Sequence, residues 1–528
     1  MPDIERGYRE TATTSLVMYC EVQSRLRECR SKSLSAHNEY HLFNQYGDDN
    51  MVKDTTKAIG RSNAKRVNLS QLESSEFERM NLNAAGIDIG NGFHCVAVPA
   101  GRDTETVREF DCFTSDLDAL VNWLLKCRIE TAAMESTGVY WIPLYEKLEA
   151  AGIEVLLVNA RQIKNVNGRK TDVLDCQWIQ RLHTYGLLQG AFRPDAQICE
   201  LRGYMRQRSM VIKMGSMHIQ HMQKALSLMN LQLANVLSDV TGETGMRIIR
   251  SILNGERDPG VLAAHRDPRC KSSLEKIKKS LTGHYKKEQI HALRQAVDGY
   301  DFYQTQMIAC DFEIERHLLS FATVLEEAPA LEEKQTKGFA IKPKKKKKKG
   351  GNAPVFDVRS ALRRVLGVDL TTVPGIEEGT ALCLMSEIGM DMSRFRSGKA
   401  FAAWLGLSPD NKISGGKVLS SKTKRTGSRA ARALTMAAFT LHKNKSALGA
   451  FYRRLKGRIG PSKAITATAH KLALIIYNML KHGEEYVEKG QEFYENMYKE
   501  RAINSLKKRA QALGFAIVES QVNSALGI

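Results

Sequence analysis

The stretch AAGIDIGNGFHCVAVPAG, residues 84–101, decides the fold of the first domain of this chain. Small and branched apolar residues alternate in its first half and again in its second half, and an Asn-Gly pair stands between the halves. This pattern predicts two strands joined by a tight turn. Asp88 lies in the middle of the first strand, where an unpaired carboxylate would be costly to bury. An acid at that position therefore indicates a functional role.

The segments that follow alternate between strand and helix patterns. In order, they predict a strand (105–113), an amphipathic helix (115–128), a strand (131–136), a helix (138–152), a strand (153–160) and, after a polar loop, a helix (172–188). A meander of three strands followed by alternating helices and strands is typical of an RNase H-like α/β domain. In that fold the first and fourth strands are neighbours.

Composition and periodicity divide the chain into six predicted regions. These are an N-terminal extension (1–82), the RNase H-like α/β domain (84–200), a helical coiled-coil region (201–325), a lysine-rich linker (326–360), a mainly α, basic C-terminal domain (361–490) and a helical tail (491–528). Apolar residues from Ile219 to Val236 step by three and four, which predicts a coiled-coil seam. An ordinary helical hairpin with a second helix around 293–318 is the alternative. The six consecutive lysines at 344–349 are typical of disordered, self-repelling chain.

The net charge of +20 is concentrated in the C-terminal domain. Residues 394–482 contain 19 Lys or Arg and one acid, Asp410. Such one-sided charge predicts a polyanionic partner, most simply nucleic acid, rather than a merely solvated surface.

The ten cysteines form no C-x-x-C pair or Cys/His cluster at zinc spacing, so we expect reduced thiols in a cytosolic protein. The N-terminus lacks the basic and apolar regions of a signal peptide. The most apolar late stretch, 464–480, is interrupted by His470 and Lys471 and is too short to span a bilayer. No membrane partner is expected.

Four carboxylates are expected to converge in the α/β domain. Asp88 lies on the first strand, Glu135 ends the fourth, and Asp172 and Asp175 project from one face of a helix start. Four clustered carboxylates need a cation, since like charges raise one another's pKa. Oxygen ligands without His or Cys select Mg²⁺ or Mn²⁺. Taken singly, the two helical aspartates are also explained by the helix dipole, and Glu135 by a helix start.

A basic loop, SPDNKISGGKVLSSKTKRTGSR (408–429), contains a serine followed by two glycines. The glycines permit close backbone approach, and the lysines on either side of Ser414 are placed to hold a phosphate. From spacing alone, a turn that contacts phosphate is the stronger interpretation. The residues expected to bind nucleic acid are Lys412, Gly415, Gly416, Lys417, Lys422, Lys424, Arg425 and Arg429.

Several segments together resemble the DEDD transposases of the IS110 family of bacterial insertion sequences. They are GIDIGNGFH, AMESTGVYW, VLLVNARQIKNVNGRKTDVLDCQWIQRL, TVPGIEEGTALCLMSEIG, FRSGKAFAAWLGLSP and SGGK…TGSRAARALTMAAF, between residues 84 and 482. The resemblance implies a RuvC-like metal site whose tetrad falls on Asp88, Glu135, Asp172 and Asp175. It also implies a nucleophilic serine at the S-G-G motif, Ser414.

The same resemblance implies a recombinase that acts on element ends and target DNA in the bacterial cytoplasm. Proteins of this family are guided by a structured bridge RNA, and we expect a homo-oligomer, either a dimer or a tetramer. Nothing in the family pattern corresponds to residues 1–82 or to the lysine run.

Three other functions are alternatives to transposition. A sugar kinase or actin-like ATPase also carries a GIDIG-like phosphate loop, but it would need a repeated fold half that this chain lacks. A RuvC-like structure-specific nuclease would share the tetrad and use water as the nucleophile. A non-catalytic nucleic-acid binder would need only the basic charge, so the intact carboxylates argue against it.

Overall fold

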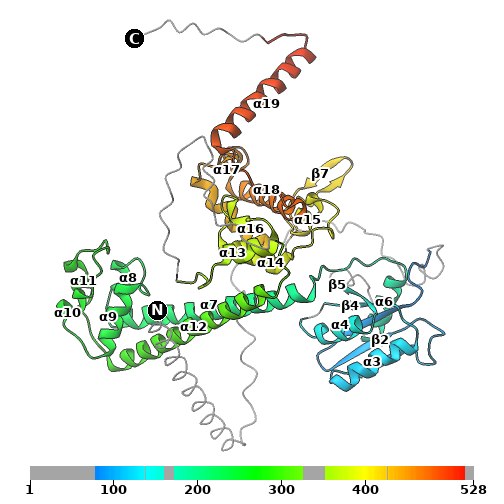
Figure 1. The fold of residues 1–528 in the computed structure, drawn as a ribbon, viewed down its shortest axis with the longest axis horizontal. Helices are drawn as coiled ribbons and strands as arrows, with labels where there is room; N and C mark the ends of the chain where they lie inside the picture. Colours follow the sequence, from blue (N-terminus) through cyan, green and yellow to red (C-terminus); the bar gives the residue numbers. More distant parts are fainter. Residues whose placement is uncertain (1–77, 137, 160–171, 325–350, 425, 518–528) are drawn as a thin grey trace, which may run out of the picture. The chain divides into compact units, whose positions relative to one another are not determined.

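A computed structural model of the 528-residue chain describes residues 78–136, 138–159, 172–324, 351–424 and 426–517. The chain forms two compact units, Met1–Gln189 and Gly190–Ile528. The first is an α/β domain built on one sheet, and the second is almost entirely helical (Figure 1). This order confirms a mixed α/β domain followed by a mostly helical remainder. Most of the predicted N-terminal extension and the lysine run lie outside the described residues.

The first unit contains a five-stranded mixed sheet with the strand order β3-β2-β1-β4-β5. The strands are β1 (Ala84–Ile89), β2 (Phe93–Ala97), β3 (Val107–Asp111), β4 (Thr131–Glu135) and β5 (Glu154–Val158). β2 runs antiparallel to β1 and β3, whereas β1, β4 and β5 are parallel. The prediction that the first and fourth strands are neighbours is confirmed.

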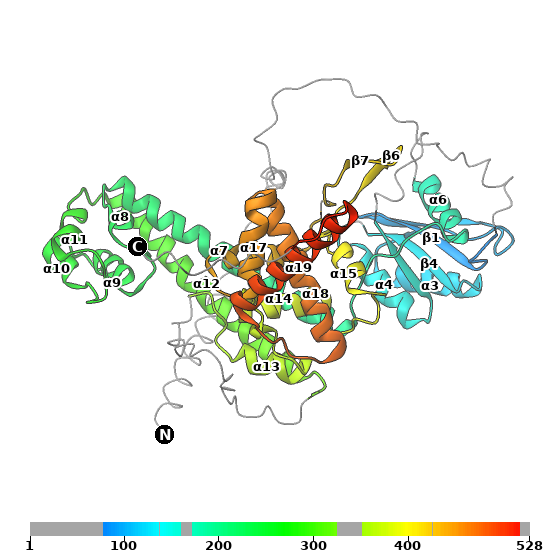
Figure 2. The same ribbon diagram turned by 90° about the horizontal axis from the view of Figure 1, so that it is seen from above.

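Helices cover both faces of this sheet (Figure 2). α3 (Thr114–Lys126) and α4 (Trp141–Ala150) lie on one face, and α6 (Asp172–Thr184) lies on the other. Ile87 of β1 and Met134 of β4 are fully buried in the cluster that includes α3 and α4. Burial of each such side chain contributes about 1.5–3 kcal/mol. The strand residues that alternate with these two therefore face α6.

Two long helices, α7 (Ala196–Leu228) and α12 (Lys287–Leu319), pack along each other in the second unit (Figure 1). The four short helices between them are α8 (Leu233–Val236), α9 (Glu243–Leu253), α10 (Pro259–Ala264) and α11 (Leu274–Ser280). These helices share one apolar cluster with the end of α7 and the start of α12. Arg208 of α7 and Asp311 of α12 form a buried ion pair across the hairpin.

The predicted continuous seam from Ile219 to Val236 does not lie on one helix. α7 ends at Leu228, and Asn230 adopts a left-handed φ of 56° that breaks the helix. Asparagine tolerates this conformation better than most residues. Leu233, on the separate helix α8, is buried in the same cluster as Met222 of α7. These apolar positions therefore pack within the chain, as the helical-hairpin alternative predicts.

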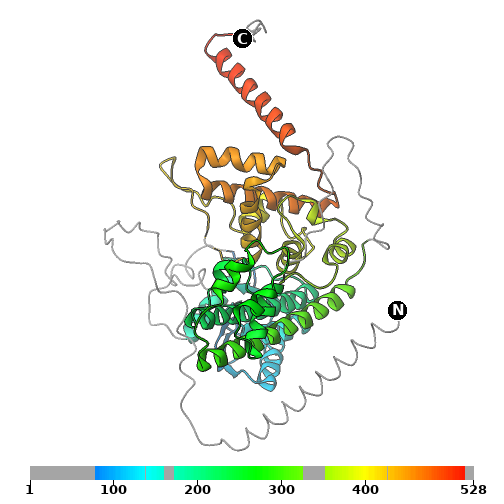
Figure 3. The same ribbon diagram turned by 90° about the vertical axis from the view of Figure 1, so that its left-hand side faces the viewer.

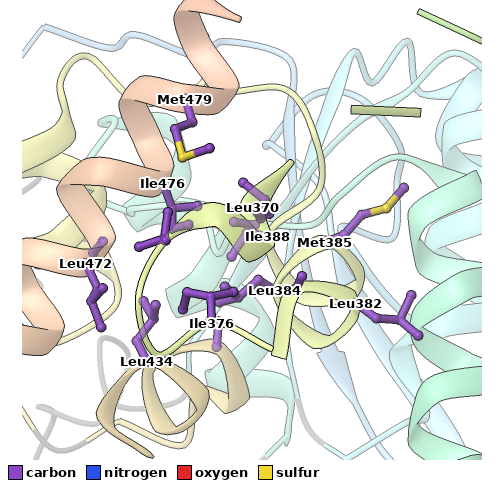
Figure 4. Close-up of a cluster of buried hydrophobic side chains, with 14 of the residues drawn as sticks. Leu370, Ile376, Leu382, Leu384, Met385, Ile388, Leu434, Leu472, Ile476 and Met479 are labelled. Atoms are coloured by element: carbon purple, nitrogen blue, oxygen red, sulfur yellow. The ribbon is translucent and has the colours of Figure 1, made fainter. Parts of the chain in front are cut away.

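The helices after the linker share a second core. They are α13 (Val358–Leu366), α14 (Glu378–Ile388), α15 (Gly398–Trp404), α16 (Arg429–Thr440), α17 (Ala447–Ile459) and α18 (Pro461–His482), with 3₁₀ turns η1 (Leu370–Thr372) and η2 (Leu441–Lys443). Leu384, Leu434 and Ile476 meet in this core from three different helices (Figure 4). α17 and α18 pack side by side (Figure 3).

Two further features complete the second unit. A hairpin of β6 (Lys412–Ser414) and β7 (Lys417–Ser420) interrupts the helices between α15 and α16. The last described helix, α19 (Gly490–Ala512), has no buried residue. Within the described ranges, no helix combines the length and the apolar character needed to cross a membrane.

Candidate active site

The register of the sheet places Asp88 beside Glu135. β1 and β4 are parallel, and Ile87 lies opposite Met134, so the next position on each strand holds one of the two acids. Ile87 and Met134 point into the core formed with α3 and α4. Because side chains alternate along a strand, both acids point to the opposite face, where α6 lies. Neighbouring strands are roughly 4.8 Å apart, which is close enough for two carboxylates to share a cation.

Helix α6 lies directly against β1 at Gly86. A Cβ atom at this position would collide with backbone atoms of Cys176 and Gln180, so a glycine is required for the contact. The Cys176 Sγ lies 3.3 Å from the Sγ of Cys95 on β2, and both are buried thiols that form no disulfide. Gln180 Nε2 donates a hydrogen bond of 3.3 Å to the carbonyl oxygen of Ala84. These contacts hold the middle of α6 over β1 and β2.

The last turn of α6 is attached to the start of β4. His183 Nε2 and Thr131 Oγ1 form a hydrogen bond of 2.9 Å, and Asn81 Nδ2 donates one of 2.7 Å to the carbonyl oxygen of His183. Burial lowers the pKa of His183, which favours the neutral imidazole. α6 is therefore held against the sheet from Cys176 to His183.

The two candidate carboxylates of α6 lie in its first turn. Asp172 is its first residue, and Asp175 stands one position before the buried Cys176. The pKa of Cys176 is raised, mainly by burial and by its hydrogen bond with Cys95, and the negative charge of Asp88 adds to the rise. Asp88 is thus within electrostatic reach of the start of α6. The side chain of Asp172 lies outside the described atoms.

The chemistry of this donor set fits a hard cation. All four candidates offer carboxylate oxygens, which Mg²⁺ and Mn²⁺ prefer. Among the side chains that the structure describes, no three His, Cys, Asp or Glu groups are close enough to hold one ion together. Asp88, Glu135 and Asp175 each take part in further interactions in the folded chain. They are partly exposed, as ligands that must reach a substrate need to be.

Ser414 lies on a β-hairpin. β6 and β7 are antiparallel, with Ser414 opposite Lys417 and Ile413 opposite Val418. The two residues between the strands are Gly415 and Gly416, with φ angles of 54° and 74°. Positive φ at both central positions is what a type I′ turn requires, and this turn matches the twist of a hairpin. The serine hydroxyl is exposed beside the turn.

Most of the predicted nucleic-acid-binding residues surround this hairpin in exposed positions. The lysines are Lys412, Lys417, Lys422 and Lys424. Arg425 lies outside the described residues. Arg429 opens α16, and its Nε is 4.0 Å from an oxygen of Glu387. Arg206 already binds that carboxylate through hydrogen bonds of 3.2 and 3.0 Å, so the charge of Arg429 is only weakly compensated.

Two features of the site differ from or add to the sequence prediction. Residues 408–429 were expected to form a loop, whereas the structure contains strands on either side of the glycine pair. The signal for this hairpin is two short β-branched segments separated by Gly-Gly. The role of Gly86 was not predicted. A glycine inside a strand pattern is the signal for close backbone approach.

Two family models match two separate regions of the chain. A family model described as "Transposase", for the DEDD type of IS110 elements, matches residues 85–230. A second model, described as "Transposase IS116/IS110/IS902 family", matches residues 369–453. The first region contains the four candidate carboxylates, and the second contains Ser414 with the basic residues around it.

One curated relative is the Sinorhizobium fredii protein named "Putative transposase y4pF/y4sB". It is 32% identical over 124 residues, which is 22% of this chain and 32% of the relative. The match therefore spans less than a third of the relative's length.

Proposed function

The chain belongs to the IS116/IS110/IS902 transposase family, and from this premise we propose that it excises and inserts a DNA element by breaking and rejoining strands through a covalent phosphoserine intermediate. The observation that carries the proposal is the juxtaposition of Asp88 and Glu135 on the sheet face covered by α6. The strand order and the helices on both faces support an RNase H-like, RuvC-like identity for this domain.

Asp88, Glu135, Asp172 and Asp175 are the residues that would hold Mg²⁺ or Mn²⁺. Such ions, when bound, polarise a scissile phosphate and stabilise the leaving oxygen. The protein contributes the rigid support. Gly86 lets α6 sit directly on β1, and the interactions of Gln180 and His183 keep it there. Two acids on the sheet and two on the helix would then be presented as one constellation.

Ser414 would act as the nucleophile. Its hydroxyl loses a proton, its oxygen bonds to phosphorus, and the bond from phosphorus to the leaving DNA oxygen breaks as that oxygen is protonated. The phosphoserine bond retains the energy of the phosphodiester, so a second DNA hydroxyl can reverse the step without ATP. Lys417, opposite Ser414 in the hairpin, is placed to bind a non-bridging phosphate oxygen.

The complete site would be composite. The carboxylates belong to the first unit and Ser414 to the second, so the reaction needs both units at one phosphate. We propose that the active form is a homo-oligomer, a dimer or tetramer, in which two copies can share a site. The basic charge alone would serve RNA or DNA equally. The support for a bridge RNA as guide therefore comes from the family resemblance.

A trapping assay tests this function. The full chain is incubated with labelled element-end DNA, Mg²⁺ and the transcript of the flanking DNA, and a covalent protein–DNA band is sought in a denaturing gel. We expect the band to disappear in Ser414→Ala and in Glu135→Ala. Ser420→Ala, on the other strand of the same hairpin, is the matched control and should keep the band.

The rival functions give different outcomes in the same assay. DNA that is cut without an adduct, and is still cut by Ser414→Ala, would identify a water-using nuclease and remove the serine from the mechanism. DNA that is bound but never cut by the unaltered chain would identify a non-catalytic binder.

A further inference from the structure

The helical hairpin of α7 and α12 contains a cavity at the end where α7 finishes and α12 begins. Its volume is about 470 Å³, and ligand pockets in proteins are typically about 300–1,000 Å³. The short helices α8 to α11 gather at the same end of the hairpin (Figure 1). Polar side chains from both long helices line the cavity: His218, His221 and Lys224 from α7, and Gln289 and Gln295 from α12.

The apolar part of the lining consists largely of small side chains. Ala225 and Ala296 are buried, and Ala292 lines the cavity from an exposed position. Small side chains leave room for a planar group, and the two glutamine amides offer both donors and acceptors. A nucleobase matches this lining, since its faces stack on side chains and its edges carry donors and acceptors.

The ring of His218 is held in place by α12. A Cβ atom on Gly299 would lie 2.3 Å from the His218 Cε1, so the ring uses space that only a glycine leaves free. The ring centroid is 5.4 Å from that of Tyr303. Burial, and then the neighbouring His221, lower the pKa of His218, which favours the neutral imidazole. A neutral aromatic ring at the wall of a cavity is suited to stack on a base.

The hydrogen bonding of His218 also points to a missing partner. Its Nδ1 is buried and forms no hydrogen bond within the described part of the chain. A buried N–H without an acceptor is costly, so the proton of the neutral ring belongs on Nε2. The ring can therefore donate one hydrogen bond through Nε2 to a ligand that carries an acceptor oxygen or nitrogen.

The positive charge beside the cavity indicates a ligand that carries phosphates. Lys224 is exposed on its wall, and Lys286 and Lys287 are exposed just before Gln289. The turn that contains them is tied to the end of α7, because the His284 backbone N–H donates a hydrogen bond of 2.8 Å to the carbonyl oxygen of Met229. Four more exposed lysines lie on α11 and just before it, at 271, 276, 278 and 279, and the single acid from 271 to 287 is Glu275.

Two observations narrow the choice of nucleic acid. The cavity has room for one base and not for a duplex, and taking a base out of a DNA stack costs a few kcal/mol. Loops and bulges of RNA present unpaired nucleotides at no such cost, and these are the parts of RNA that proteins read by stacking and by contacts to base edges. An unpaired nucleotide of RNA is therefore the ligand that fits the cavity and the lysines together.

We propose that the cavity binds one unpaired nucleotide of a folded RNA, with the base beside His218 and the adjoining phosphates on Lys224 and Lys286. This inference rests on the proposed function only in expecting an RNA partner, because neither the four carboxylates nor Ser414 takes part in it. The short helices from 231 to 286 lie outside both regions that the family models match. The lysines on and around α11 would extend the same RNA contact along the backbone.

The test is hydrogen–deuterium exchange of the full chain with an RNA hairpin whose loop contains all four bases. We expect the hairpin to slow exchange in peptides that cover 218–228 and 289–296. Ala292→Phe places a ring in the cavity from an exposed helical position, so the fold should be kept. In this variant we expect the RNA concentration for half-maximal protection of these peptides to rise about fivefold or more, which is the loss expected for one stacked base.

Ala309→Phe is the matched control, since Ala309 is also exposed on α12 and does not line the cavity. It should keep the protection of the unaltered chain. Absence of protection, or protection that Ala292→Phe preserves, would overturn the site. Equal protection by the fully paired RNA stem would also overturn it, because phosphates alone would then explain the binding.

Other ligands serve as separate arms. Equal protection by a DNA hairpin with the same loop would overturn the assignment to RNA, and equal protection by free nucleoside monophosphates would overturn the need for a folded RNA. The covalent adduct of the trapping assay reports the proposed function independently. Loss of the adduct in the unaltered chain with protection intact would reject the serine chemistry and leave the nucleotide site standing.

Discussion

Replacing Gly86 by alanine tests the contact that positions the candidate carboxylates. The added Cβ would lie 2.7 Å from the Cα of Gln180, with other backbone atoms of α6 nearer still. Carbon atoms pack at about 3.5 Å or more, so this contact alone requires α6 to move outward by at least roughly 0.8 Å. Neither the strand nor the helix can relieve this overlap by rotating a side chain. Overpacking of this kind costs about 1–3 kcal/mol.

The stability change is measured by urea unfolding followed by tryptophan fluorescence. Trp123, Trp141 and Trp178 lie in the first unit and Trp404 lies in the second, so most of the signal reports the sheet domain. We expect Gly86→Ala to lower the free energy of unfolding of this domain by about 2 kcal/mol.

The functional change should be larger than the stability change. A displacement approaching 1 Å carries Asp172 and Asp175 away from Asp88 and Glu135, and a misplacement of that size can cost about 100-fold in rate. The assay is adduct formation at a temperature where the variant remains folded.

Gly92→Ala is the matched control. Gly92 follows β1 in the same hairpin, and a Cβ there would meet nothing within 4 Å. We expect its free energy of unfolding to stay within about 0.5 kcal/mol of the unaltered chain. If Gly86→Ala proved as stable and as active as this control, the close packing of α6 on β1 would be refuted, along with the site built on it.

Three further predictions concern other contacts. Asp311→Ala leaves Arg208 charged and buried without its partner, so we expect about 3–5 kcal/mol of destabilisation in thermal unfolding, and an unchanged midpoint would contradict the ion pair. Copper phenanthroline should join Cys95 to Cys176 in the folded chain, as seen by peptide mass after alkylation; continued alkylation of both thiols would argue against their proximity. The pKa of His183 is lowered from 6.5 by burial, so the unfolded chain binds the proton more readily, and stability falls as pH drops below about 6.5. His183→Gln should flatten this decline between pH 7.5 and 5.5, and an equally steep decline would reject the assignment.

Much of the sheet domain follows from local pattern. Short apolar or alternating segments predict β1 to β5, and the placement of Asp88 inside an apolar strand marks it as a functional candidate before any tertiary contact is known. The β6–β7 hairpin was not predicted, because lysines and serines interrupt the apolar pattern of its two short strands. The end of α7 was missed because residues beyond it remain buried at helix-like intervals, although Asn230 has already broken the helix.

By itself, the sequence determined which segments form the strands of the sheet domain, that an acid stands in the first of them, and where the positive charge is concentrated. These properties depend on neighbours a few residues apart, so periodicity reveals them. Only the tertiary structure decided that α6 rests on Gly86, that Cys95 meets Cys176 and that Ile413 pairs with Val418 on the face opposite Ser414. The hydrogen bond from Gln180 to Ala84 joins residues 96 positions apart. The distance between such elements is set by packing of side chains and backbone in three dimensions, which no local pattern encodes.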